Sequence, residues 1–162
     1  KDTAVSFYHH LKRKGHFIGD FCSFAQMFKD ELLHFRYWNH LFSAWHRRSH
    51  TNLKIMWYED MKADTTAAVE ELGQFLQHPL SSEQKSLLCE CVRFDNMKKN
   101  ENAYNNTGFN NNTTENHFMR KGIVGDWKNH FDAKTNREFN EWILCKIDGS
   151  GMDELEIIKK LY

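Results

Sequence analysis

Cysteine is scarce in this chain of 162 residues, which contains four of them: Cys22, Cys89, Cys91 and Cys145. Such scattered cysteines exclude the disulfide framework of a small secreted scaffold. We expect free thiols in the core, as in a protein of a reducing compartment. Cys89 and Cys91 stand two positions apart on an expected helix and point in different directions, which argues against a metal-binding pair.

Net charge is also absent, because 22 Lys and Arg residues balance 22 Asp and Glu residues. No global field therefore draws the protein to nucleic acid or anionic lipid, and any anion site must be local. The sequence lacks an apolar run of about eighteen residues, so no membrane span is expected. Aromatic residues make up 14% of the chain, which argues against disorder and for one domain with its own core.

Most of the chain has the apolar spacing of amphipathic helices. The sequence predicts a helix over residues 1–14, ended by Gly15, and a second that begins at the cap Asp20. Further helices are expected around 38–45, after Asp64 or Thr65, from the Ser81 capping box to about Cys91, and around 139–145. The expected core positions are Val5, Tyr8, Leu11, Phe21, Phe24, Ala25, Phe28, Trp38, Leu41, Phe42, Trp45, Val69, Leu72, Phe75, Leu76, Phe139, Trp142, Ile143 and Cys145.

The stretch from Leu53 to Tyr58 is different, because it is largely apolar and ends in β-forming residues before a charged break. This pattern predicts a short buried strand of a parallel sheet that is covered on both faces. One strand among several helices is typical of the later half of an α/β fold. A short glycine-hinged helix is expected to close the chain over 148–162.

Helical and strand patterns both dissolve over residues 100–118, which are rich in Asn and Thr. A loop of this length in a compact domain is typical of a lid, and we expect a mobile, lid-like segment. The loop contains three formal glycosylation acceptors, beginning at Asn105, Asn111 and Asn112, which would matter only in a secreted protein.

The next stretch, RKGIVGDW from Arg120 to Trp127, concentrates charge, bare backbone and bulk. The Arg120 guanidinium offers planar donors that fork onto a phosphate, and Lys121 adds a compact positive charge. Gly122 has no side chain, so a phosphate could approach its backbone N–H directly. An ordinary surface turn with two cations and two glycines is the alternative that the octapeptide alone leaves open.

At its full length, RKGIVGDWKNHF resembles the signature near the C-terminal end of the soluble, cytosolic sulfotransferases, which transfer sulfonate from 3′-phosphoadenosine 5′-phosphosulfate (PAPS). Three other stretches agree in the family's order. KDTAVSFYHH resembles the helix with a phosphate-binding serine, WYEDMK the strand end whose tyrosine meets adenine, and FDNMKKN the segment over the purine. The resemblance implies the C-terminal part of a P-loop-like, three-layer α/β domain with a parallel sheet flanked by helices.

The resemblance also implies roles for particular residues. Ser6 and the segment Arg120, Lys121 and Gly122 would bind the 3′-phosphate of PAPS or of its product, 3′-phosphoadenosine 5′-phosphate. Three further residues would surround the adenine: Tyr58 would contact it, Phe94 would stack on it, and Met97 would lie nearby.

Several features of the family have no counterpart here. The glycine-rich phosphate loop with its lysine, the general-base histidine and the arginine before the serine helix are missing, and none of the ten histidines takes the catalytic place. We therefore expect residues 1–162 to be the C-terminal part of one sulfotransferase domain. This part would bind the donor without turning it over, so no catalytic residue is assigned. The family's dimer motif is also altered, with Asp132, Ala133 and Arg137 in its places, although a homodimer stays possible.

The leading interpretation is part of a cytoplasmic, PAPS-dependent sulfotransferase acting on a small hydroxylated acceptor such as a phenol, steroid or alcohol. A truncated relative that only binds is the alternative. A different P-loop enzyme, such as a kinase, lacks support because no Walker lysine motif is present. The glycosylation acceptors leave a link to secretory carbohydrate sulfotransferases open. No metal is expected, because His46 and His50 form an i, i+4 pair without a third ligand.

Overall fold

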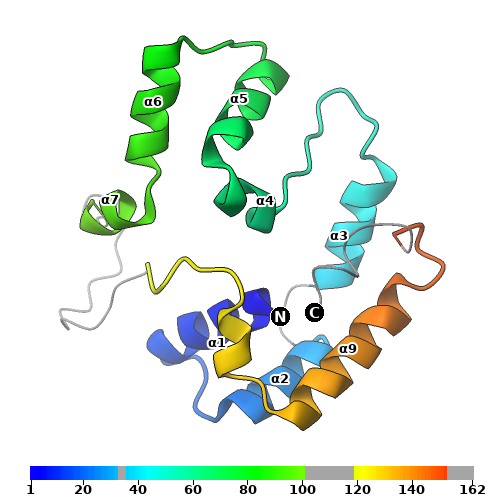
Figure 1. Cartoon of the computed structure of the whole chain (residues 1–162). Coiled ribbons are helices and arrows are strands. Elements are labelled where there is room, and N and C mark those ends of the chain that lie inside the picture. The colour runs from blue at the N-terminus through cyan, green and yellow to red at the C-terminus, as the bar shows by residue number, and fades with distance from the viewer. Residues whose placement is uncertain (33–35, 101–118, 153–162) are drawn as a thin grey trace. The chain divides into compact units, whose positions relative to one another are not determined.

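The computed structural model describes residues 1–32, 36–100 and 119–152. The chain divides into two compact units. Unit 1 combines Lys1–Leu53 with Gly125–Tyr162, and unit 2 is Lys54–Val124. Within the described ranges every regular element is a helix (Figure 1).

Unit 1 contains the helices α1 (Asp2–Arg13), α2 (Phe21–Lys29), α3 (Tyr37–His46) and α9 (Ala133–Ile147), and the short 3₁₀ helix η1 (Asp126–Asn129). Helix α2 packs against both α1 and α9, and η1 packs against α1 (Figure 1). The second half of unit 1 is therefore folded onto helices from the start of the chain.

Local signals set the boundaries of these helices. The Asp20 carboxylate accepts the backbone N–H of Ser23 at 2.8 Å and begins α2, as the sequence predicts. Asp132 begins α9 in the same way, by accepting the N–H of Thr135 at 2.7 Å. Gly15 takes a left-handed φ of +70° just beyond α1, where a residue without Cβ is favoured.

The core of unit 1 is built from aromatic rings. Phe28 of α2 stacks on Phe139 of α9 with ring centroids 6.2 Å apart, and Trp38 of α3 meets Trp142 of α9 at 5.4 Å. The Phe24 and Phe139 side chains are almost completely buried. The predicted core positions Val5, Tyr8, Phe21, Phe24, Ala25, Phe28, Trp38, Trp45, Phe139 and Ile143 are confirmed as buried.

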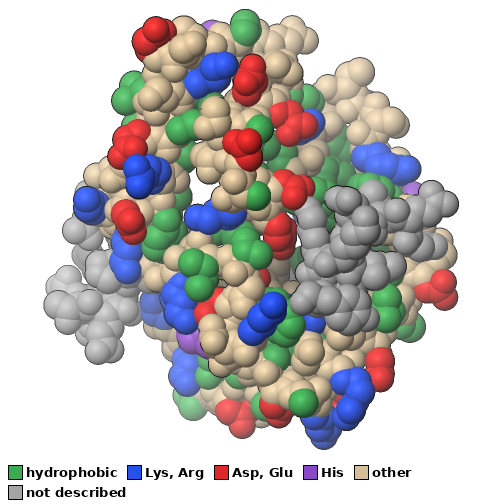
Figure 2. Space-filling view, in the orientation of Figure 1, with side chains coloured by type: hydrophobic (Ala, Val, Ile, Leu, Met, Phe, Trp, Pro, Cys, Tyr) green, Lys and Arg blue, Asp and Glu red, His purple; other side chains and the backbone are tan. Residues whose placement is uncertain are grey.

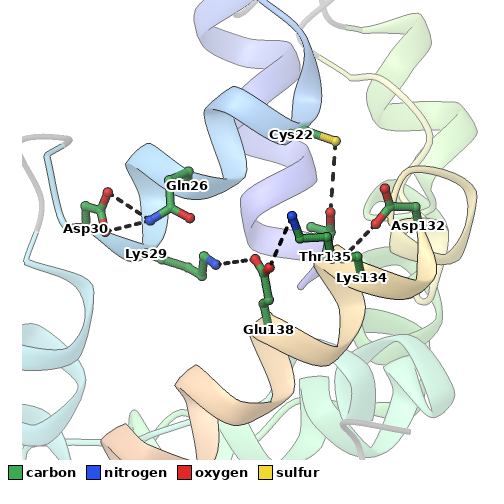
Figure 3. Close-up of polar contacts among 8 residues, drawn as sticks. All are labelled: Cys22, Gln26, Lys29, Asp30, Asp132, Lys134, Thr135 and Glu138. Carbon is green, nitrogen blue, oxygen red and sulfur yellow. Dashed lines mark hydrogen bonds and ion pairs between the residues drawn. The ribbon is translucent and has the colours of Figure 1, made fainter.

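Polar contacts join the outer edges of α2 and α9 (Figure 3). Lys29 of α2 donates to the carboxylate of Glu138 on α9 at 2.8 Å, and Lys134 lies 3.9 Å from the other oxygen of that carboxylate. The hydrogen bond from Lys29, and next its charge, lower the pKa of Glu138. The ion pair therefore reinforces the aromatic packing between the two helices.

Unit 2 contains α4 (Tyr58–Ala63), α5 (Thr65–Phe75), α6 (Ser82–Cys91) and α7 (Phe94–Lys99). Asp64 caps α5 by accepting the N–H of Ala67 at 2.9 Å. The predicted capping box of α6 is confirmed, with Ser81 and Gln84 each accepting the backbone N–H of the other. Lys85 of α6 lies 3.5 Å from Glu70 of α5, so an ion pair links these helices.

The predicted strand over Leu53–Tyr58 is not confirmed among the described residues. A strand needs ladder hydrogen bonds from a neighbour, and the described residues supply no paired strand. Residues 53–57 stay outside regular structure, and Tyr58 begins α4 instead. Glu59 and Asp60 favour this helix, because negative charge in the first turn complements the helix dipole.

Several expectations about burial are wrong. Leu72 of α5 and Leu76, the residue that follows α5, are 40% and 63% exposed, because the described part of unit 2 provides no apolar layer over them. Cys145 is exposed, and Ile147, one turn beyond Ile143, takes the buried place on α9. All four cysteines are free thiols, as expected, but none is buried, so the expectation that they lie in the core is wrong.

Acidic and basic side chains are interspersed over the face in Figure 2, in keeping with the balanced charge of the chain. Among the described helices, none is both long and apolar enough to cross a membrane. The predicted lid-like loop over 100–118, apart from Asn100, and most of the predicted closing helix over 148–162 lie outside the described residues.

Phe139→Ala should lower the free energy of unfolding of unit 1 by about 3–5 kcal/mol, because it removes a buried ring and leaves a cavity. Urea unfolding followed by circular dichroism measures this loss. Leu144→Ala, on the exposed side of the same helix, is the matched control. Equal losses in the two variants would contradict the assigned core.

Glu138→Gln should reduce the acid dependence of stability. The folded pKa of Glu138 is lowered from its ordinary value of 4.5, so its contribution is complete above pH 4.5 and is lost as the pH falls through the folded pKa. The melting temperatures of wild type and Glu138→Gln should therefore differ at pH 7 and converge in acid. Glu141→Gln, which removes an exposed carboxylate from the same helix, is the matched control.

Candidate functional site

The segment Met119–Gly122 has no regular secondary structure and leads into the turn before η1. Two glycines shape it. Gly122 has a φ of +63° and Gly125 a φ of +86°, both in the left-handed region where side chains are strained. The backbone of this segment thus depends on glycine at two points.

Gly122 lies directly against the ring of Phe94. A Cβ on Gly122 would lie 2.1 Å from Cδ2, 2.4 Å from Cε2 and 2.8 Å from Cγ of that ring. These distances are far below van der Waals contact, so no side chain fits there without moving the ring. The structure therefore brings together two residues that the sequence assigned to different parts of the donor, the phosphate and the base.

Phe94 and Met97 share the short helix α7. Phe94 is its first residue and Met97 lies one turn further on, so both project from the same side of the helix. Asn96 donates at 2.8 Å to the backbone carbonyl and to the carboxylate of Glu90, at the end of α6. The hydrogen bond to the carboxylate, and next the one from Arg93, lower the pKa of Glu90. Both hydrogen bonds of Asn96 join α7 to α6.

The other predicted site residues are at least partly accessible. In unit 2, Arg120 is half-buried, Lys121 is exposed, and Tyr58 is 46% exposed as the first residue of α4. In unit 1, Ser6 lies on the exposed face of α1, beside the buried Ala4 and Val5. Side chains in these positions remain within reach of a ligand from solvent.

The turn that follows the signature cations is held tightly within unit 1. Asp126 is only 1% exposed, and its carboxylate accepts from Nδ2 of Asn129 at 3.0 Å and lies 3.3 Å from Nε2 of His130. Trp127 packs edge-on against Phe131, and the Lys1 ammonium lies 4.0 Å from the Trp127 ring. Burial, followed by the charge of Lys128, lowers the pKa of Lys1.

Sequence reasoning missed one residue that holds this turn, Asp2 of α1. The Asp2 carboxylate accepts the backbone N–H of Gly125 at 2.6 Å and that of Trp127 at 2.8 Å. An acidic residue in the first turn of a helix is explained by the helix dipole alone. The sequence therefore carries no signal that Asp2 bonds to the distant signature.

Together these residues offer the chemistry of a nucleotide site. A guanidinium, an ammonium and a glycine backbone suit a phosphate dianion, and the half-buried Phe94 ring suits a planar base. Within the described ranges, no group of three His, Cys, Asp or Glu side chains could hold a metal ion.

The chain is similar to known proteins. The family model described as "Sulfotransferase domain" matches residues 1–151. The chain is similar to luciferin sulfotransferase of Photinus pyralis, with 29% identity over 93% of this chain and 42% of that protein. It is also similar to cytosolic sulfotransferase 1 of Danio rerio, with 34% identity over 87% of this chain and 48% of that protein. The chain thus spans about half the length of these relatives.

The fold is similar to that of a solved retinol dehydratase in complex with androsterone and the inactive cofactor PAP. The TM-score is 0.82 at 29% identity, and the match covers 90% of this chain and 44% of that one. The similarity of the fold therefore agrees with the family match of the sequence.

Gly122→Ala and Gly125→Ala form a matched pair of substitutions. Both place Cβ at positive φ, which costs roughly 1–2 kcal/mol, but only the change at Gly122 collides with Phe94, since the space around Gly125 is open. The NMR signals of the Phe94 ring should shift in Gly122→Ala and stay in place in Gly125→Ala. Unmoved ring signals in both variants would contradict the contact between Gly122 and Phe94.

Proposed function

This chain belongs to the sulfotransferase domain family, and from that premise we propose that it forms the donor-binding part of a PAPS-dependent sulfotransferase. The observation that carries the proposal is the packing of Gly122 on the Phe94 ring. It links a segment suited to a phosphate with an aromatic ring suited to a purine. A 3′-phosphoadenosine nucleotide contains both groups.

We propose that the 3′-phosphate binds Arg120, Lys121, the backbone of Gly122 and the hydroxyl of Ser6. The residue types fit this role, because a guanidinium forks onto two phosphate oxygens and a bare backbone permits close approach. Two cations also neutralise most of the charge that a phosphate dianion brings to the site.

The adenine site proposed here consists of Tyr58, Phe94 and Met97. A purine stacks on the Phe94 ring through dispersion and the complementary charge of the two π systems. The Met97 thioether is polarizable and adapts to the edge of such a ring system. Tyr58 adds an aromatic face with a hydroxyl for a polar contact.

PAPS, once bound, supplies the activated sulfonate group. The proposed contribution of this chain is to bind and orient the donor, and no general base or metal is assigned to its residues. The proposed surrounding fold is the three-layer α/β sulfotransferase domain, of which this chain is the C-terminal part, with a parallel sheet and a P-loop-like phosphate site.

We propose a small hydroxylated acceptor, such as a phenol, steroid or alcohol. The support comes from the androsterone in the complex of the similar dehydratase and from the luciferin named in the similar firefly enzyme. A cytoplasmic location is proposed because the similar zebrafish enzyme is named cytosolic. A homodimer is compatible with the proposal, although Asp132, Ala133 and Arg137 depart from the family's dimer motif.

Calorimetric titration with 3′-phosphoadenosine 5′-phosphate tests the proposal. Arg120→Ala should weaken binding about 10- to 100-fold, because charge-assisted hydrogen bonds contribute roughly 1.5–3 kcal/mol each. Lys62→Ala, which removes an exposed cation from α4 in the same unit, should bind like wild type.

Adenosine 5′-phosphate, which lacks the 3′-phosphate, is the matched ligand. Its affinity should be lower than that of the bisphosphate and should be insensitive to Arg120→Ala. Equal affinities for the two nucleotides would overturn the assignment of the 3′-phosphate site. Tight binding without sulfonate transfer by the intact enzyme would favour a protein that only binds the nucleotide.

A further inference from the structure

The turn at Gly125–Trp127 is held by a residue more than a hundred positions earlier in the chain. From this contact we infer that Asp2 is a positioning residue, whose carboxylate anchors the turn and thereby orders the phosphate-binding segment Arg120–Gly122. The anchoring of the turn rests on the hydrogen bonds of Asp2. The effect on donor binding rests on the proposed function.

Each carboxylate oxygen of Asp2 accepts a different backbone N–H. Oδ2 accepts the N–H of Gly125 at 2.6 Å, and Oδ1 accepts the N–H of Trp127 at 2.8 Å. Both distances are short for N–H···O bonds, as expected when the acceptor is charged. A carboxylate that accepts two backbone N–H groups fixes both the position and the direction of the turn.

Asp2 lies between the starts of two helices, and this position explains why a negatively charged side chain is favoured there. Gly125 is the N-cap of η1, and Trp127 is its second residue, so their N–H groups belong to the set that a helix start leaves without intrahelical partners. Asp2 itself lies in the first turn of α1. One negative charge therefore faces the N-terminal ends of two helices, where it is favoured over a neutral side chain.

Neighbouring contacts limit how the turn can move. The Lys1 ammonium covers the Trp127 ring at 4.0 Å, and Asp126 is buried with its hydrogen bonds to Asn129 and His130. The positive φ of Gly125 lets the backbone reverse at the point where Asp2 binds it. Asp2 adds two hydrogen bonds that tie this turn to the start of α1.

The connection to the donor site runs along the backbone. Gly122 stands three positions before Gly125, so fixing Gly125 restricts the end of the segment that carries Arg120 and Lys121. Ser6 lies one turn after Asp2, and positions i and i+4 share a face of a helix. The same face of α1 therefore carries both the anchor of the turn and the proposed phosphate-binding serine.

Hydrogen–deuterium exchange tests the anchor without any ligand. Asp2→Asn leaves one oxygen and places an NH₂ donor against one of the two N–H groups, so at least one hydrogen bond is lost. Exchange of the peptide covering residues 119–127 should be about tenfold faster than in wild type. Asp20→Asn, which alters a similar carboxylate cap on α2, should leave that peptide unchanged; equal exchange in all three proteins would overturn the inference.

Titration with the two nucleotides then tests whether loss of the Asp2 anchor weakens binding of the 3′-phosphate. Asp2→Asn should weaken binding of 3′-phosphoadenosine 5′-phosphate about tenfold and spare binding of adenosine 5′-phosphate. Asp2→Glu, which keeps both charged acceptors, should retain more affinity than Asp2→Asn. Equal losses for the two nucleotides would reveal general destabilisation and overturn the positioning role. If wild type binds neither nucleotide, the proposed function fails, and the exchange result alone decides whether Asp2 holds the segment.

Discussion

Continuous packing between aromatic rings is the interaction on which unit 1 depends. Phe131, directly after the signature turn, meets Phe139 of α9 at 4.9 Å and Phe21 of α2 at 5.0 Å between ring centroids. Phe139 in turn contacts Phe28 and Trp142. Each ring buries a large apolar surface and restricts its neighbours through edge and face geometry. The turn of the candidate site is therefore seated on the same core that holds α2 and α9 together.

The residues that hold the turn are therefore different from the residues proposed to bind the donor. Phe131, Trp127 and the buried Asp126 hold the turn, whereas the cations proposed to meet the donor stay partly or fully accessible in the preceding segment. A binding segment beside a fixed turn loses less conformational entropy when the ligand arrives, because part of its backbone is already ordered. The proposed donor site thus gains preorganisation without placing its charges in the core.

Unit 2 is stabilised differently from unit 1. Its described residues include no buried apolar side chain, and Leu72, Leu76 and Leu87 are exposed. Its helices are defined by caps at Asp64 and Ser81 and by ion pairs between α5 and its neighbours. The contact between Gly122 and Phe94 adds a steric constraint, because it leaves no room for a side chain at position 122.

Features that depend on near neighbours along the chain can be predicted from the sequence. Helix spacing and the caps at Asp20 and Ser81 were readable, because their interactions span a few residues. The long signature was readable because it is one uninterrupted stretch of the sequence. The tertiary structure alone decided what depends on distant partners. The residues before Tyr58 form no strand among the described residues, since a ladder needs a neighbour. Gly122 contacts Phe94, and Asp2 accepts a hydrogen bond from Gly125. Both interactions join positions far apart in the chain, and residue spacing carries no information about such contacts.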